Sequence, residues 1–167
     1  MDISIQHIIH VILVILTGLS AGLCFTWGNA VTPGIGKLDD LGFLMAFQQM
    51  NRVILNPTFF FVFIGPFFLG IINLFLSKNT NGVVWWLLLG SVILYGLGVI
   101  LVTVLGNVPL NEMIDQYALE TLDKNQLKAL REAFENKWNR FHVIRMVSAI
   151  VSFISLLITT TQITTTI

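Results

Sequence analysis

The sequence predicts an all-α integral membrane protein: a four-helix bundle with additional amphipathic helices in its two long connections. Hydrophobic residues make up 55% of the 167 residues and charged residues only 11%. The mean hydropathy is +0.83, far above that of soluble domains. Four segments provide the roughly 20 apolar residues that a helix needs to cross a bilayer. The formal net charge is zero, so we expect no nucleic-acid partner.

We place the four spans in a single membrane domain that comprises residues 1–167. Their expected ranges are about 8–27, 58–76, 83–105 and 141–158. In the first span, Gly18 and Gly22 are separated by one helical turn, a spacing that allows another helix to approach closely. The Gly65-Pro66 pair should kink the second span. The threonine-rich tail, residues 159–167, is expected to be frayed.

The connections between spans differ in length. Residues 77–82 form a tight turn rich in turn-forming residues. The first long connection has a Pro/Gly break at 32–36 and then an expected helix at 38–52. The second long connection is expected to hold two amphipathic helices. Their apolar stripes are Leu110, Met113, Ile114 and Tyr117 in the first, and Leu127, Leu130, Phe134 and Trp138 in the second.

Basic residues predict how the chain is oriented. Four spans place the tight turn and both termini on one side of the membrane and the two long connections on the other. The side with the tight turn holds Lys78, whereas the other lysines and arginines lie at the side of the long connections. By the positive-inside rule, both long connections are expected in the cytoplasm and both termini outside, in the cytoplasmic (inner) membrane.

Polar residues gather at the face of the long connections. Trp138, His142 and Arg145 share one face of the fourth helix, and Arg145 lies about one turn inside its apolar run. An arginine at that depth costs a few kcal/mol unless it faces protein or trapped water, which marks a candidate functional site. The full candidate set at this face is Asn51, Arg52, Asn56, Asn107, Asn111, Trp138, Asn139, His142 and Arg145.

Two other interpretations of this set stay open at the level of sequence. The polar residues could simply be hydrogen-bonded to one another and hold three helices together. Alternatively, Arg145 extends to the headgroups and Trp138 anchors at the interface. We expect no metal site built from all three histidines, because His7 and His10 begin the first span, a membrane thickness away from His142. A two-histidine site at His7 and His10 stays open, although interfacial histidines usually just hydrate.

Three segments in this order resemble a known family. They are residues 51–57 (NRVILNP), 106–111 (GNVPLN) and 138–145 (WNRFHVIR). Together they are similar to the anthrone oxygenase-like family of small four-span membrane proteins, and the resemblance covers nearly the whole chain. It implies oxidation of an anthrone or a similar polycyclic, polyketide-like substrate by O₂, with no metal or flavin cofactor.

The resemblance also implies roles for the candidate residues. His142 would be the base that removes a proton, and Arg145, Asn107 and Asn111 would stabilise the charge that develops on oxygen. Trp138 would stack on the flat substrate. The remaining candidates would line a substrate pocket: Asn51, Arg52, Asn56 and Asn139.

A different class of function remains an alternative. The chain would then be a non-enzymatic membrane protein whose polar pocket binds a lipid, a quinone or a partner subunit. The partners expected under either reading are membrane lipid and an apolar aromatic small molecule. Under the non-enzymatic reading, partner subunits would pack on the chain through Gly18, Gly22 and the glycines of the third span. A homo-oligomer is a further candidate assembly.

Overall fold

The computed structural model describes residues 4–80 and 82–164, which fold into helices with no strand among them. Four helices in this part of the chain are long and apolar enough to cross a membrane: Ile5–Ile35, Pro57–Leu76, Gly82–Asp115 and Lys124–Gln162. The predicted all-α membrane bundle is therefore confirmed, and the chain is an integral membrane protein.

The first span does not end where the sequence predicted. Helix α1 (Ile5–Thr26) runs through a π-helical turn, Trp27–Val31, directly into α2 (Thr32–Ile35). The predicted break at 32–36 is wrong up to Ile35, and Pro33 lies inside the helical rod. A wide π-helical turn just before the proline accommodates a residue that has no N–H to donate.

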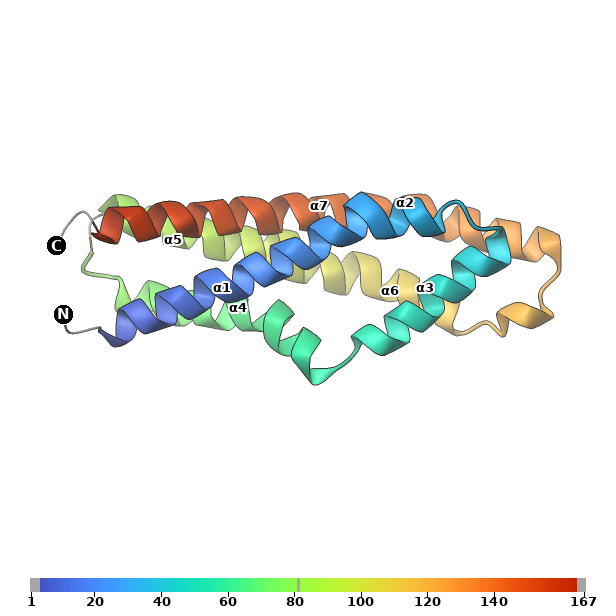
Figure 1. The fold of residues 1–167 in the computed structure, drawn as a ribbon, viewed down its shortest axis with the longest axis horizontal. Helices are drawn as coiled ribbons and strands as arrows, with labels where there is room; N and C mark the ends of the chain where they lie inside the picture. The colour runs from blue at the N-terminus through green and yellow to red at the C-terminus, as the bar shows by residue number, and fades with distance from the viewer. Residues whose placement is uncertain (1–3, 81, 165–167) are drawn as a thin grey trace.

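The two predicted amphipathic helices are extensions of the spans beside them. Helix α5 (Gly82–Tyr95) continues through π-helical residues Gly96–Leu101 and Thr103–Asn107 into α6 (Val108–Asp115). After a short 3₁₀ turn, Leu119–Thr121, helix α7 runs without a break from Lys124 to Thr164, over 41 residues. The long red-to-orange helix of Figure 1 therefore joins the membrane half of the bundle to its polar end.

The threonine-rich tail is helical as far as Thr164, so the predicted fraying is wrong for 159–164, and residues 165–167 lie outside the described residues. The hydroxyls of Thr159 and Thr160 both donate to the carbonyl of Leu156, at 2.7 and 3.0 Å. Such bonds back to the preceding turn satisfy a hydroxyl inside an apolar bundle. The ring of His10 lies beside these threonines, with its Nε2 atom 2.9 Å from Oγ1 of Thr160.

Helix α3 (Asp40–Ile54) follows α2, close to its predicted range. The carboxylate of Asp39 accepts a hydrogen bond from the N–H of Gly42 and caps the start of α3. Helix α4 (Pro57–Leu76) then begins at a sharp corner, Leu55–Asn56, that projects from the bundle in Figure 1. Pro66 lies inside α4, and α4 remains one helix across it.

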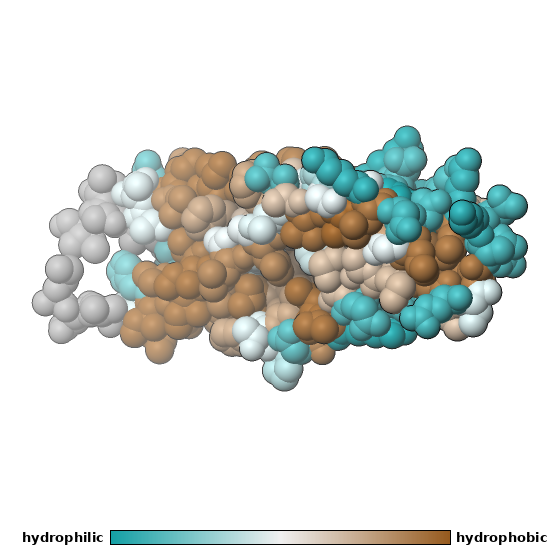
Figure 2. All heavy atoms as spheres, turned by 45° about the vertical axis from the view of Figure 1, so that its right-hand side comes forward, coloured by the Kyte–Doolittle hydropathy of each residue, from teal (hydrophilic) through white to brown (hydrophobic). Residues whose placement is uncertain are grey.

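Within the described residues, the bundle has one hydrophobic core at its polar end and two hydrophobic clusters in its membrane half. In the membrane half, α1 packs on α4 and α7, and α5 packs on α7. At the polar end, α3 and α6 cover the first turns of α7 with a cluster that includes Phe43, Phe47 and Phe134. Figure 2 shows the same division on the surface, with hydrophobic atoms over the spans and hydrophilic atoms at the far end.

Glycines set the closest helix contacts within this single chain. A Cβ atom on Gly18 would lie 2.8 Å from the ring of Phe153, so the predicted close approach at this residue is confirmed. Nothing lies within 4 Å of such an atom on Gly22. A Cβ atom on Gly106 would lie 2.7 Å from the ring of Phe141, so the absence of a side chain there lets the α5–α6 rod lie directly against α7.

Candidate active site

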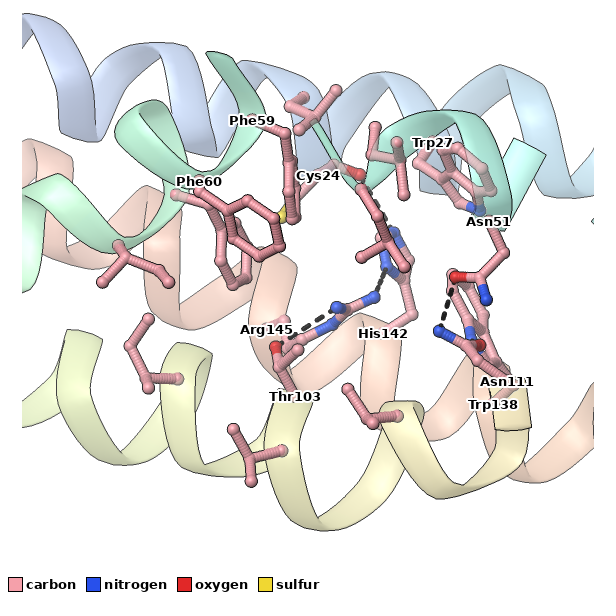
Figure 3. A pocket seen from close by; sticks show the side chains of 18 of the residues that line it. Cys24, Trp27, Asn51, Phe59, Phe60, Thr103, Asn111, Trp138, His142 and Arg145 are labelled. Atoms are coloured by element: carbon pink, nitrogen blue, oxygen red, sulfur yellow. Dashed lines mark hydrogen bonds between the residues drawn. The ribbon is translucent and has the colours of Figure 1, made fainter. Parts of the chain in front are cut away.

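A cavity of about 220 Å³ lies between the polar-end core and the membrane cluster that holds Cys24 and Phe63, where α1, α3, α4, the α5–α6 rod and α7 meet. Its walls are mostly apolar, with Phe59, Phe60 and Phe63 of α4 along one side. The polar groups of His142 and Arg145 project into it from α7 on the other side (Figure 3). The cavity therefore combines an apolar wall with one charged end.

Three π-helical segments of the described chain contribute to the cavity lining. The first, Trp27–Val31, contributes Trp27; the second, Gly96–Leu101, contributes Ile100; and the third, Thr103–Asn107, contributes Thr103 and Val104. A π-helical turn holds an extra residue and so redirects the side chains around it, and such turns are frequent at functional sites. Gly28, within the first turn, leaves room for the imidazole, because a Cβ atom there would lie 3.3 Å from Nε2 of His142.

Arg145 supplies the only charge in the cavity lining. Its side chain is buried, with one terminal nitrogen donating to Oγ1 of Thr103 at 3.2 Å and the other to Nδ1 of His142 at 3.0 Å. The guanidinium carbon lies 5.3 Å from the centre of the Trp138 ring, a cation–π contact. The predicted alternative, in which Arg145 extends to the headgroups, does not fit this buried position.

The hydrogen bonds of His142 determine its tautomer. Arginine can only donate, so Nδ1 must carry the lone pair that accepts from Arg145. The other ring nitrogen, Nε2, lies 3.0 Å from the carbonyl oxygen of Cys24, which can only accept, so Nε2 carries the proton. The imidazole is thus neutral, and both of its nitrogens are already occupied.

The charge on Arg145 has no counterion in the cavity. No aspartate or glutamate lines it, and no ion pair to Arg145 is formed within the described residues. The Nε–H of Arg145 is buried without a hydrogen-bond partner, and so is the indole N–H of Trp27. Unpaired buried donors are costly, and their natural partner is an electron-rich oxygen.

Trp138 is enclosed in a cluster of rings. His142 stacks on it at 5.0 Å with an interplanar angle of 12°, and Phe47 meets it edge-on at 4.9 Å. Its indole N–H donates to Oδ1 of Asn111 at 2.7 Å. Stacking of Trp138 on a flat substrate, as predicted, would require His142 to move away from this face. The rings of Phe59 and Phe60 are better placed, because they face the cavity opposite Arg145 (Figure 3).

The structure brings five of the nine candidate residues to the cavity lining: Asn51, Asn111, Trp138, His142 and Arg145. Asn111 links two of the others, because its amide nitrogen donates to Oδ1 of Asn51 at 2.8 Å while its oxygen accepts from Trp138. Asn107 is buried next to this group but does not line the cavity. Its amide nitrogen donates to the carbonyl of Trp138, and its Oδ1 has no partner.

The remaining three candidates lie elsewhere. Arg52 pairs with Asp115 at 2.7 Å on the surface, with about half of each side chain exposed. Asn56 caps helix α4: its Oδ1 accepts from the N–H of Phe59, and its amide nitrogen donates to the carbonyl of Val53. Asn139 lies on α7 away from the cavity lining. The expectation that these residues complete the pocket therefore does not match the structure.

Sequence reasoning missed several residues that line the cavity. Cys24, Trp27 and Thr103 belong to it, together with the three phenylalanines of α4. Phe59 and Phe63 are separated by one helical turn and stack at 5.0 Å, a spacing that was visible in the sequence. Trp27 and Thr103 gave no such signal, because π-helical turns rather than helical periodicity direct them inward.

The fold and the cavity define a class of protein: a small four-span membrane bundle with a mostly apolar internal cavity that holds one buried cationic side chain. The anthrone oxygenase family matches residues 58–155, more than half of the chain, and the chain belongs to this family. The family resemblance found in the sequence is thereby confirmed. Comparison with curated proteins and with solved structures gave no match.

Proposed function

We propose that the cavity binds a flat polycyclic substrate of the anthrone type and promotes its oxidation by O₂. One observation carries this proposal: the guanidinium of Arg145 lies buried in an apolar cavity without a counterion and with an unpaired N–H. A donor held in this way favours a substrate oxygen that becomes negative during the reaction. Membership of the anthrone oxygenase family supports the same chemistry.

The proposed reaction balances without a further reactant. Loss of a proton from the central ring of an anthrone gives an enolate, whose negative oxygen pairs with Arg145. The electron-rich ring carbon reduces O₂, and a C–O bond forms. The resulting hydroperoxide breaks its O–O bond, loses water and leaves a second carbonyl. In sum, anthrone and O₂ give anthraquinone and water, and each product receives one of the two oxygen atoms of O₂.

His142 has a conditional role in this scheme. Its Nδ1 lone pair accepts from Arg145 in the structure, so it is not free to take a proton. When the guanidinium turns from the imidazole to a substrate oxygen, that lone pair becomes available. We therefore propose that His142 first positions Arg145 and serves as the base only once the substrate has displaced this hydrogen bond.

The test uses the full-length protein purified in detergent, with anthrone as the probe substrate and ¹⁸O₂ as the oxidant. We expect O₂ uptake above the rate without protein, one labelled oxygen atom per anthraquinone, and activity that persists after treatment with a metal chelator. The absence of any rate above that of the protein-free solution would contradict the proposal. A co-purifying lipid or quinone together with no turnover would favour the binding alternative.

We also propose that the long connections face the cytoplasm and that the termini face the opposite side of the cytoplasmic membrane. The distribution of lysine and arginine supports this orientation. Single cysteines at the exposed positions Lys78 and Lys124, in a Cys24→Ala background, provide the test in intact cells. An impermeant maleimide should label the cysteine at 78 and not the one at 124, and the reverse pattern would overturn the orientation.

A further inference from the structure

Some residues of the cavity wall also form part of the outer surface of the bundle. They are Leu55, Phe60, Val104 and Val108, with exposed fractions of 60, 43, 54 and 37%. Two come from the α3–α4 corner and the first turn of α4, and two from the α5–α6 rod. These four residues mark a mouth through which the cavity opens sideways, and all four side chains are apolar.

The charged residues around the mouth show its depth in the membrane. The exposed ion pair between Arg52 and Asp115 lies toward the polar end of the bundle. Val104 precedes Asp115 on the same helical rod by roughly 16 Å, at 1.5 Å per residue. Exposed apolar side chains surround it, Leu101 and Leu105 among them. The Val104 end of the mouth therefore lies on the apolar surface of the spans, well away from the charged residues at the polar end.

We infer that the cavity takes its ligand sideways from the bilayer, through this mouth, and not from water. The ligand class is an apolar, flat molecule with one electron-rich oxygen at its edge. This inference rests on the cavity being the ligand site of the proposed function, but it does not depend on the oxidation step.

The order of the lining residues supports this direction of entry. A molecule that passes the mouth meets apolar side chains first and then the rings of Phe59 and Phe63. The unpaired donor of Arg145 lies on the opposite wall, on α7. A charged solute would lose its hydration at the apolar mouth before it reached this donor, which is unfavourable. An apolar molecule dissolved among acyl chains has no such hydration to lose.

Photolabelling of the full chain in phosphatidylcholine vesicles tests the inference. The probe is a lipid-soluble aryl diazirine, and mass spectrometry measures the label at Cys24 and Phe63, both buried and both in the cavity lining. Leu88, fully buried elsewhere in the bundle, provides the background. We expect label at the two cavity residues well above this background. We expect none above background from a sulfonated diazirine added to the water.

Two matched variants identify the route. Val104→Trp narrows the mouth, whereas Leu97→Trp adds the same side chain at an equally exposed position of the same rod, outside the cavity lining. Because both positions face outward, both variants should fold. We expect Val104→Trp to lower the label at Cys24 by about tenfold, which corresponds to roughly 1.4 kcal/mol. Leu97→Trp should leave it unchanged.

Three outcomes would overturn the inference. They are label at Cys24 no higher than at Leu88, equal label at Cys24 in Val104→Trp and Leu97→Trp, or label at Cys24 from the sulfonated probe that equals the label from the lipid-soluble probe. These outcomes are separable from failure of the proposed function. A protein that is labelled through the mouth but oxidises no anthrone would keep the lateral entry and lose the oxygenase. A protein that oxidises anthrone but is not labelled would lose only the lateral entry.

Discussion

Arg145 donates a hydrogen bond of 3.0 Å to Nδ1 of His142, one turn earlier on the same helix. This bond, together with the bond from Nε2–H to the carbonyl of Cys24, fixes the imidazole as a neutral acceptor toward the guanidinium. Sequence alone suggested a free base at His142. The structure instead shows a histidine that holds a buried charge in place.

Replacing Arg145 with Gln should remove most of the anthrone oxidation. The loss of one preorganised donor to a developing oxyanion typically lowers kcat by about 10²–10³-fold. Arg140→Gln is the matched control, because Arg140 is an exposed arginine of the same helix. The measurement is kcat by anthraquinone formation, with detergent-solubilised protein checked by size-exclusion chromatography. Equal turnover in the two variants would remove Arg145 from the mechanism.

Substitutions of His142 separate a positioning role from a base. His142→Asn places an amide oxygen close to Nδ1, so it can still accept from Arg145 but cannot take a proton, whereas His142→Ala does neither. If His142 only positions Arg145, the Asn variant should retain most of kcat and the Ala variant should not. If His142 is also the base, both variants should lose about 10²–10⁴-fold in kcat. Unchanged anthrone consumption in the Ala variant would exclude His142 from the reaction.

Arg52→Ala should have only a small effect. The pair with Asp115 is about half exposed, and an ion pair of this kind contributes about 0–1 kcal/mol to stability. Because Arg52 does not line the cavity, we expect KM and kcat for anthrone within about twofold of the unsubstituted chain. A large fall in kcat would show that Arg52 reaches the substrate in a conformation other than the one described.

Gly106→Ala should destabilise the bundle more than Gly22→Ala. A Cβ atom at Gly106 would lie 2.7 Å from the rigid ring of Phe141, so the α5–α6 rod and α7 must separate. Overpacking of this kind costs about 1–3 kcal/mol. Gly22 has nothing within 4 Å and provides the control. Thermal unfolding in detergent, followed by circular dichroism, should show a lower Tm for Gly106→Ala alone.

The sequence was sufficient for the class of fold because hydropathy and length alone identify membrane helices. The sequence did not show where those helices end. Pro33 and the glycines near it predicted a break, but a π-helical turn at Trp27–Val31 carries the helix past the proline. Similarly, the apolar stripe predicted around Ile114 lies on a helix, but that helix is continuous with the third span and not separate from it as predicted. Hydrophobic periodicity does not reveal whether two adjacent helical segments are joined.

The candidate site could be predicted only in part, for a related reason. Helical spacing placed Trp138, His142 and Arg145 on one face, and all three line the cavity. Exclusion from the pocket could not be deduced for Arg52, because only the packing of the helices brings it to its partner Asp115, 63 residues away. Asn56 is instead occupied locally, as the N-cap that accepts from the N–H of Phe59. Trp27 and Thr103 could not be predicted because π-helical turns, which the sequence pattern does not reveal, direct them inward. Local pattern identifies a face, whereas tertiary contacts decide which residues reach the cavity.

The unbroken course of α7 restricts how this pocket can respond to an occupant. Trp138, His142 and Arg145 follow one another on a single 41-residue helix, with no joint between them that could change their spacing. The opposite wall belongs to α4, which begins at the non-helical elbow Leu55–Asn56. A helix movement that tightens the pocket around a guest is therefore expected from the phenylalanine side, which can pivot at that elbow, while the backbone of α7 stays in place and only its side chains turn.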